Sequence, residues 1–271
     1  ERPDRAFGNL KEAVGTNDIT KYFPYLVTKD EADPSAFTLL WVQREAVRHR
    51  ASALVVECMA VDPALQAVSE HDMVRATIGV ITNVRLDHGD VMGATIEEVG
   101  DALSNTVPRD AVLVVGPTTG TAAIERAADA RRTRVIRARA PGDRREGADS
   151  DWMAENIAIA LAVARELGVA ESVAVRGMQA ATPDPGAVAR GTVRIESRSV
   201  DYLDATSAND PESLLRLLGT RHAGAHFVFN HRADRPWRLR QFAQLPPWPH
   251  PDDELLVTGD RPDWLTWRHV R

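Results

Sequence analysis

Two apolar runs that end in polar residues constrain the fold of this chain most strongly. Residues 54–61 and residues 78–93 each begin with the run of branched apolar side chains that is typical of a buried parallel strand. Both runs then pass into polar groups suited to magnesium and phosphate rather than to a core. The sequence therefore predicts a parallel sheet with a polar site where two of its strands end.

The composition limits the class of protein. The chain has 271 residues, 44% hydrophobic and 27% charged, enough to bury one large core or two modest ones. Its net charge of -6, without a run dense in lysine or arginine, excludes a nucleic-acid footprint, because that affinity comes from clustered cations. The single cysteine, Cys58, excludes an intramolecular disulfide and fits a reducing compartment. No apolar stretch approaches the roughly 20 residues of a membrane span, so we expect a cytoplasmic protein.

Strands and helices are predicted to alternate along the N-terminal part of the chain. Apolar runs indicate strands at 53–56, 77–82, 111–115 and 134–138. Helical periodicity indicates helices at 35–50, 94–106, 119–130 and 152–167. The helix at 94–106 opens with Thr95, whose hydroxyl can cap it. This alternation predicts an α/β fold with a doubly wound, mainly parallel sheet.

A second, smaller α/β unit is predicted beyond a boundary between residues 180 and 191. Prolines and a glycine at 182–186 interrupt the periodicity there, which gives a domain at 1–185 and another at 186–271. In the second unit we expect strands around 192–196, 226–230 and 254–258, a strand or a turn around 200–204, and a helix at 211–219.

Candidate metal ligands follow the first two predicted strands. Glu57 lies where an apolar strand meets a loop, and its carboxylate can hold Mg²⁺, although a surface acid or a helix cap would look the same. Asp87 and His88 follow the next strand, and an isolated pair of this kind is more often a hydrogen-bonded loop than a ligand set. Two strand ends that carry Glu57 and Asn83 through His88 together make a more specific pattern.

Four segments in order resemble the ligase subunit of poly-γ-glutamate synthase, a member of the Mur ligase superfamily. They are residues 55–63 (VVECMAVDP), 81–93 (ITNVRLDHGDVMG), 204–213 (DATSANDPES) and 229–235 (FNHRADR). The resemblance covers residues 35–245 approximately. It implies a Mur-ligase-like central ATPase domain, a smaller Rossmann-like C-terminal domain, and ATP-dependent formation of an amide bond.

The resemblance also implies roles for individual residues. Glu57 matches a magnesium-binding glutamate, His88 matches a histidine that serves a second magnesium, and Asn83, beside Asp87 in the same motif, would help to order the metal–phosphate loop. Asn156 matches a helix asparagine near adenine, with a helix-surface amide as an equal alternative.

Three residues of the second unit complete the implied site. Asp204 resembles an acid that approaches the nucleotide when the domains close, and a turn residue is the alternative. Arg232 and Arg235 could grip carboxylate or phosphate bidentately, although surface arginines are common in this chain.

The implied cofactors are ATP and Mg²⁺, and the implied substrate is glutamate or a growing polyglutamate chain. A substrate carboxylate would form an acyl phosphate with the γ-phosphate of ATP. An incoming amine would then displace the phosphate and form the amide bond. The resemblance further implies small membrane subunits as partners, which would recruit the protein to the inner membrane face. We also expect a homo-oligomer.

The phosphate-binding loop departs from the family pattern. Gly15, Thr16 and Thr20 belong to the best candidate, but Asp18 and Ile19 stand where glycine and lysine are expected. No lysine follows Lys29, so none can serve as the carbamylated lysine of many Mur ligases.

These departures leave two hypotheses: an active amide ligase whose phosphate loop lies elsewhere, and a degenerate, Mur-ligase-like nucleotide-binding or scaffolding subunit. A folylpolyglutamate synthase is a third option, disfavoured because residues 57–61 and 208–213 look less like it.

Overall fold

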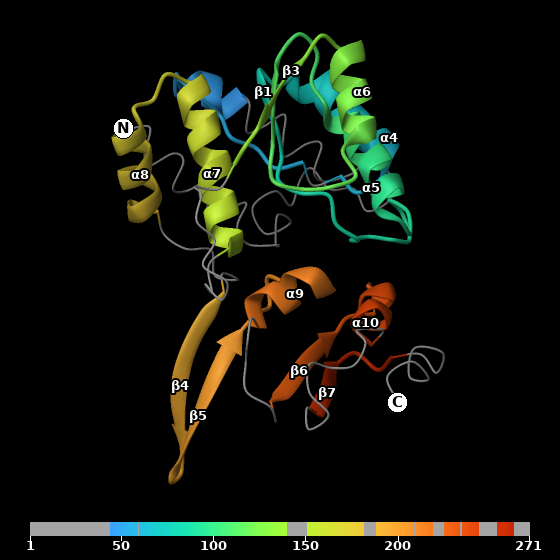
Figure 1. Cartoon of the computed structure of the whole chain (residues 1–271), viewed down its shortest axis with the longest axis vertical. Coiled ribbons are helices and arrows are strands. Elements are labelled where there is room, and N and C mark those ends of the chain that lie inside the picture. The colour runs from blue at the N-terminus through green and yellow to red at the C-terminus, as the bar shows by residue number, and fades with distance from the viewer. Residues whose placement is uncertain are drawn as a thin grey trace.

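The computed structural model describes residues 44–58, 60–139, 151–181, 188–208, 210–218, 225–233, 235–243 and 254–262. The described elements form two groups: a central unit of residues 44–181 and a C-terminal unit of residues 188–262 (Figure 1). The candidate phosphate loop with Gly15, Thr16 and Thr20 lies outside the described residues, as does the predicted domain boundary. None of the described helices combines the length and the apolar character that a membrane crossing needs.

The central unit is built on a parallel sheet. Its strands are β1 (Ile78–Ile81), β2 (Val112–Val115) and β3 (Arg134–Arg137), in the spatial order β1-β2-β3. Gly79, Leu113 and Val135 lie side by side in register across the three strands. The strands predicted at 77–82, 111–115 and 134–138 are therefore confirmed.

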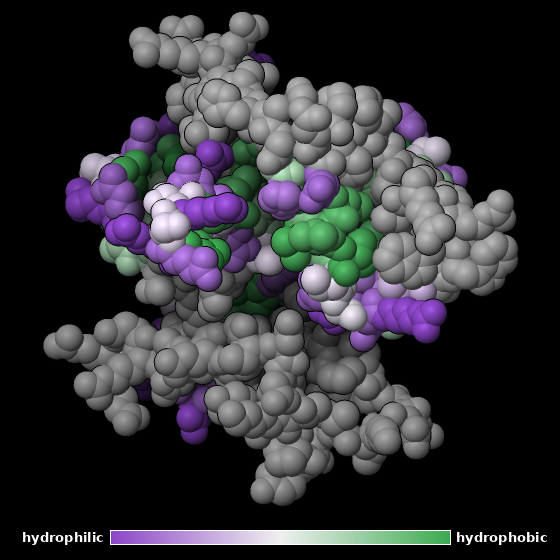
Figure 2. Space-filling view, turned by 90° about the horizontal axis from the view of Figure 1, so that it is seen from below, coloured by the Kyte–Doolittle hydropathy of each residue, from purple (hydrophilic) through white to green (hydrophobic). Residues whose placement is uncertain are grey.

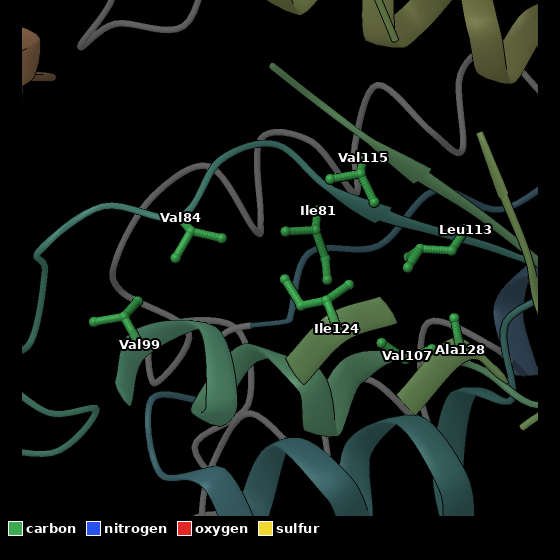
Figure 3. Close-up of a cluster of buried hydrophobic side chains, with 8 residues drawn as sticks. All are labelled: Ile81, Val84, Val99, Val107, Leu113, Val115, Ile124 and Ala128. Carbon is green, nitrogen blue, oxygen red and sulfur yellow. The ribbon is translucent and has the colours of Figure 1, made fainter. Parts of the chain in front are cut away.

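Helices cover both faces of this sheet. Leu113 and Val115 of β2 pack with Ile124 against the face covered by α5 (Ile96–Leu103) and α6 (Ala122–Ala130), as Figure 3 shows. Val114, which points the other way, packs on Ile159 of α7 (Asp151–Glu166). Because side chains alternate along a strand, an apolar run such as β2 must be covered on both sides. The doubly wound fold and the helix predicted at 152–167 are confirmed.

A capping box begins α5. The backbone N–H of Glu98 donates to Thr95 Oγ1 at 3.2 Å, and the Glu98 carboxylate accepts from the backbone N–H of Thr95 at 3.1 Å. These hydrogen bonds, with one from the backbone N–H of Ala94, hold the pKa of Glu98 below its usual value. The cap predicted at Thr95 is confirmed, and the last turn of the predicted helix is the 3-10 helix η2 (Ser104–Thr106).

The strand predicted at 53–56 is wrong. Residues 53–58 form neither strand nor helix, and Val55 is 92% exposed. An apolar run becomes a strand only where a neighbouring strand supplies hydrogen bonds, and β1 pairs with β2 alone among the described strands. Residues 44–50 of the helix predicted at 35–50 are described: residues 44–48 are helical and residues 49–50 form a turn.

Three described helical elements of the central unit were not predicted. Asp62 caps α4 (Pro63–Val68) by accepting from the backbone N–H of Ala64 at 2.8 Å, and the π-helix η1 (Ser69–Val74) follows it. The helix α8 (Glu171–Ala180) has no buried residue, so its sequence carries no strong apolar stripe.

The C-terminal unit combines a hairpin with a small parallel sheet. The antiparallel hairpin consists of β4 (Ala189–Ile195) and β5 (Arg198–Asp204), and the parallel pair consists of β6 (His226–His231) and β7 (Glu254–Gly259). The helices are α9 (Pro211–Leu218) and α10 (Pro236–Ala243). All these strands and α9 match predicted elements, whereas α10 was not predicted.

The β6–β7 pair is covered on one face. Phe229 of β6 meets Phe242 of α10 with ring centroids 5.2 Å apart, and Leu239 of α10 is fully buried. On the opposite face Val228 and Leu256 lie side by side in register and are 68% and 49% exposed. Seen from below, the described surface likewise shows apolar regions beside strongly polar ones (Figure 2).

Replacing Thr95 by alanine removes the acceptor of the α5 cap. We expect Thr95→Ala to lower the free energy of unfolding by about 1 kcal/mol, as for other threonine caps. Thr121→Ala is the control, because Thr121 precedes α6 but makes no capping hydrogen bond with its side chain. Urea denaturation of both variants measures the difference, and an equal loss in the two would contradict the role of the cap.

Candidate active site

The strand ends of β1 and β2 are tied together by one hydroxyl. Val84, which is buried, follows β1, and its backbone N–H donates to Thr118 Oγ1 at 2.8 Å. The same hydroxyl donates to the carbonyl oxygen of Val84 at 3.2 Å. A threonine hydroxyl both accepts and donates, so Thr118 satisfies both polar backbone groups of one residue. The first residues of the loop after β1 are thus held in place at the carboxyl edge of the sheet.

A glycine allows the two loops to approach so closely. A Cβ built on Gly116, at the end of β2, would lie 2.0 Å from the carbonyl oxygen of Thr82. Any side chain at this position would therefore push the loop after β1 away from the loop after β2.

Asn83, Asp87 and His88 all lie on this loop. The Asn83 amide donates to Thr82 Oγ1 at 3.4 Å. The Asp87 carboxylate accepts from the backbone N–H of His88 at 2.9 Å, and His88 adopts a left-handed backbone conformation with φ of 49°. His88 Nε2 lies 3.8 Å from Asp87 Oδ1. Asp87 therefore holds both the backbone and the imidazole of His88.

Helix α10 of the C-terminal unit faces this loop. The His88 ring lies 5.5 Å from the Trp237 ring, centroid to centroid. Arg238 Nη2 lies 3.7 Å from Asp87 Oδ1, and the Gln241 side chain donates to the carbonyl oxygen of Leu86 at 3.3 Å. The structure thus brings the predicted residues Asp87 and His88 against side chains that the sequence did not single out.

Three arginines cluster where α10 begins. Backbone hydrogen bonds join Arg235 to Arg232 at 3.0 Å and Arg238 to Arg235 at 3.2 Å, so the three follow one another at successive turns. Burial lowers the pKa of Arg238, Asp87 opposes that shift, and the charges of Arg235 and Arg232 add to it. Arg238 Nε is buried and has no hydrogen-bond partner among the described residues. Such a concentration of guanidinium groups suits a carboxylate or a phosphate.

The end of β7 fixes the segment that carries these arginines. The Asp260 carboxylate accepts from the backbone N–H of Ala233 at 2.8 Å, and the Asp260 N–H donates to the carbonyl oxygen of His231 at 2.9 Å. Gly259 has φ of 84°, and a Cβ there would lie 2.3 Å from the His231 oxygen. Only glycine permits this close approach without strain.

Glu57 is exposed and lies in the irregular segment before α4. Among the described residues, no three His, Cys, Asp or Glu side chains lie close enough to form a metal cage. Mg²⁺ commonly keeps its waters and binds one or two carboxylates together with substrate phosphates. Asp87 and Asn83 on the loop after β1 carry oxygen donors of this kind. The binding of one magnesium by Glu57 and of a second by His88 stays a prediction.

Asn156 and Asp204 lie in different surroundings. Asn156 is exposed on α7. Asp204 ends β5 and accepts from the backbone N–H of Thr206 at 3.0 Å. Hydrogen bonds from the backbone and the hydroxyl of Thr206 lower the pKa of Asp204, so its carboxylate shapes a turn. Their roles toward a nucleotide stay predictions.

Sequence reasoning missed several residues of the site. Arg238 follows Arg232 and Arg235 at the same three-residue spacing, which could have revealed it. Thr118 lies in a glycine- and threonine-rich stretch after a predicted strand, where a strand-end loop could have been suspected. Nothing in the sequence indicated that Arg85, on the loop after β1, would be largely shielded from solvent.

The fold matches that of a solved ligase. The superposition on FPGS in complex with AMPPCP and folate has a TM-score of 0.56 and covers 95% of this chain and 75% of that chain. The identity is 14%, so the likeness concerns the fold alone. The class is therefore the Mur ligase fold that the sequence predicted.

One family profile and two relatives show which proteins this chain resembles in sequence. Residues 192–271 match the poly-gamma-glutamate synthase CapB C-terminal domain. The chain is 37% identical over 212 residues to the capsule biosynthesis protein CapB of Bacillus anthracis, with 75% of this chain and 46% of that protein aligned. It is 36% identical over 215 residues to the PGA synthase CapB of Bacillus subtilis, with 74% and 54% aligned.

The predicted resemblance to the poly-γ-glutamate synthase ligase subunit is thus confirmed, and the match to the CapB C-terminal domain covers residues 192–271. The chain spans about half the length of the two CapB relatives.

The Thr118 hydroxyl gives a testable prediction. Thr118→Val leaves the buried N–H and C=O of Val84 without their partner, so we expect it to lower the free energy of unfolding by about 1–3 kcal/mol. Thr118→Ser keeps the hydroxyl and should lose much less. Denaturant titration of both variants tests this expectation, and equal stability of Thr118→Val and Thr118→Ser would refute the tie between the strand ends.

Proposed function

We propose that this chain provides the nucleotide and acceptor sites of an ATP-dependent amide ligase that forms γ-glutamyl bonds. One observation carries the proposal: the loop with Asp87 and His88 at the carboxyl edge of a parallel sheet faces Trp237 and Arg238 of α10. Ligands of doubly wound sheets bind at this edge. The names of the CapB relatives and the Mur ligase fold support a ligase with a glutamate substrate.

The residues of the loop after β1 are assigned to the phosphates of ATP. Glu57 would bind one Mg²⁺ and His88 a second, and Asn83, beside Asp87, would help to order the loop around them. Magnesium bound there supplies positive charge against the phosphate oxygens. Asn156 is assigned to adenine and Asp204 to the nucleotide. Gly15, Thr16 and Thr20, which lie outside the described residues, are assigned to the phosphate loop.

The reaction has two steps. In the first, a carboxylate oxygen of the acceptor bonds to the γ-phosphorus of ATP while the bond to the bridging oxygen breaks, giving an acyl phosphate and ADP. In the second, the amine of glutamate attacks the acyl carbon, loses a proton and expels phosphate. Both steps build negative charge on oxygen atoms, which nearby guanidinium groups stabilise.

The arginines are assigned to the carboxylates of glutamate or polyglutamate. Arg232 and Arg235 lie close enough to Arg238 to lower its pKa. In the absence of an anion, the positive charges of the three guanidinium groups therefore repel one another. A substrate with several carboxylates relieves this repulsion. Polyglutamate is such a substrate.

A scaffolding subunit without catalysis is the second candidate. The stretch from Gly15 to Thr20 lacks the lysine that contacts the β- and γ-phosphates, and Asp18 would repel them. A protein of this kind keeps the fold and the contacts between its units but does not hydrolyse ATP.

Release of ADP from Mg-ATP distinguishes the two candidates. The intact protein is assayed with and without L-glutamate, D-glutamate and a short γ-glutamyl primer. For the ligase we expect glutamate-dependent turnover that Glu57→Ala abolishes and that Asp129→Ala, an exposed acid of α6, leaves unchanged. Absence of both turnover and ATP binding in the wild-type protein would establish the scaffold instead.

The arginine assignment is tested by substrate affinity. We expect Arg232→Ala and Arg235→Ala each to raise KM for the γ-glutamyl primer about tenfold, equivalent to roughly 1.4 kcal/mol, with KM for ATP nearly unchanged. Arg176→Ala, an exposed arginine of α8, is the matched control. A rise in KM for ATP instead would reassign these arginines to phosphate.

A further inference from the structure

Arg85 is a largely shielded arginine that joins the loop after β1 to two helices. Its side chain is 12% exposed and lies on the loop after β1. Nη1 donates to Ser213 Oγ of α9 at 2.8 Å, and Nη2 donates to Glu155 Oε2 of α7 at 3.5 Å. Nε lies 3.9 Å from Glu212 Oε1 of α9. One guanidinium thus spans the central unit and the C-terminal unit.

Hydrogen bonds hold the chain on both sides of the contact between Arg85 and Ser213. On the central side, Arg85 directly follows Val84, whose backbone is held by Thr118. On the C-terminal side, the buried Asp210 accepts from both the N–H of Ser213, at 2.9 Å, and its hydroxyl, at 2.5 Å. Because the hydroxyl proton is directed at Asp210, the lone pairs of Ser213 Oγ are available to Arg85.

The same loop carries the residues assigned to the phosphates. Asp87 and His88 follow Arg85 by two and three residues, and they contact Arg238 and Trp237 of α10. The loop from 85 to 88 therefore contacts α9 through its first residue and α10 through its last residues. Because Arg85 contacts α9, we expect a displacement of α9 to displace the segment that carries Asp87 and His88 as well.

The contact should break as a unit. The Arg85 guanidinium is 12% exposed and Glu155 is 14% exposed, so the guanidinium loses stabilisation when this partner leaves, because its charge is then poorly solvated. The arrangement therefore favours two states, one with Arg85 seated and one with the guanidinium hydrated.

We propose that Arg85 is a positioning residue, which couples the seating of the C-terminal unit on α7 to the placement of Asp87 and His88. Arg85 itself contacts neither ATP nor glutamate. The kinetic consequence rests on the proposed ligase function, whereas the conformational consequence does not.

Amide hydrogen exchange of the intact protein tests the conformational part. In Arg85→Ala we expect faster exchange, by about tenfold or more, in α9 and in residues 86–92, with α5 and α6 unchanged. Arg132→Ala is the matched control, because Arg132 makes two hydrogen bonds to Asp110 but is exposed and stays within the central unit. Unchanged exchange in α9, or an equal acceleration that includes α5 and α6, would overturn the proposal.

Conservative variants sharpen this test. Ser213→Ala removes one arm of the contact and should give the same pattern with a smaller amplitude. Arg85→Lys keeps the charge but not the planar fork, so it should restore protection only in part. If the amides of α9 and residues 86–92 exchanged as fast in Arg85→Lys as in Arg85→Ala, the positive charge would not contribute to the coupling. The proposal would then fail.

Steady-state kinetics test the consequence for catalysis. We expect Arg85→Ala to lower kcat about tenfold or more while KM for ATP stays within about twofold, because the misplaced loop affects the reacting geometry more than nucleotide binding. Arg132→Ala should retain both constants. A rise in KM for ATP with kcat intact would contradict positioning. If the wild-type protein shows no turnover, the ligase proposal fails while the exchange result still decides the role of Arg85.

Discussion

The burial of β2 on both of its faces is the constraint on which the rest of the structure depends. Leu113 and Val115 are covered by α5 and α6, and Val114 is covered by α7. A strand whose successive side chains are all apolar can be satisfied only between two layers of helices. That enclosure sets the carboxyl ends of β1 and β2 side by side, so the loops that follow them share one edge of the sheet.

Charge then connects this edge to the C-terminal unit. Asp87 faces Arg238, while Arg85 faces Glu155 and Glu212, so acids and arginines alternate across the contact. The arrangement orients the loop after β1 on both sides. It also leaves a guanidinium-rich edge that an anionic substrate can complete. In the proposed ligase, positioning of the loop and recognition of the substrate would depend on the same few contacts.

Much of the fold could be predicted from local patterns. The strands β1, β2 and β3 were found because buried parallel strands are continuous apolar runs, and α5 was found because Thr95 and Glu98 form a local capping box. The predicted strand at 53–56 failed, because pairing with a neighbour is a property of the sheet and not of the run. Helix α8 was not predicted, and none of its residues is buried. Helix α10 could have been found from Pro236 at its start and the spacing of Leu239 and Phe242.

The sequence alone determined the doubly wound class, most of the strands and the chemistry available at their ends, since these follow from side-chain periodicity and residue type. It also placed Asp87 and His88 at the edge of the sheet. Only the tertiary structure decided that Arg85 would lie between α7 and α9 and that Arg238 would face Asp87. The partners of these arginines lie far away in the chain, and an ion pair between distant residues leaves no local pattern, because it exists only after the two units have packed together.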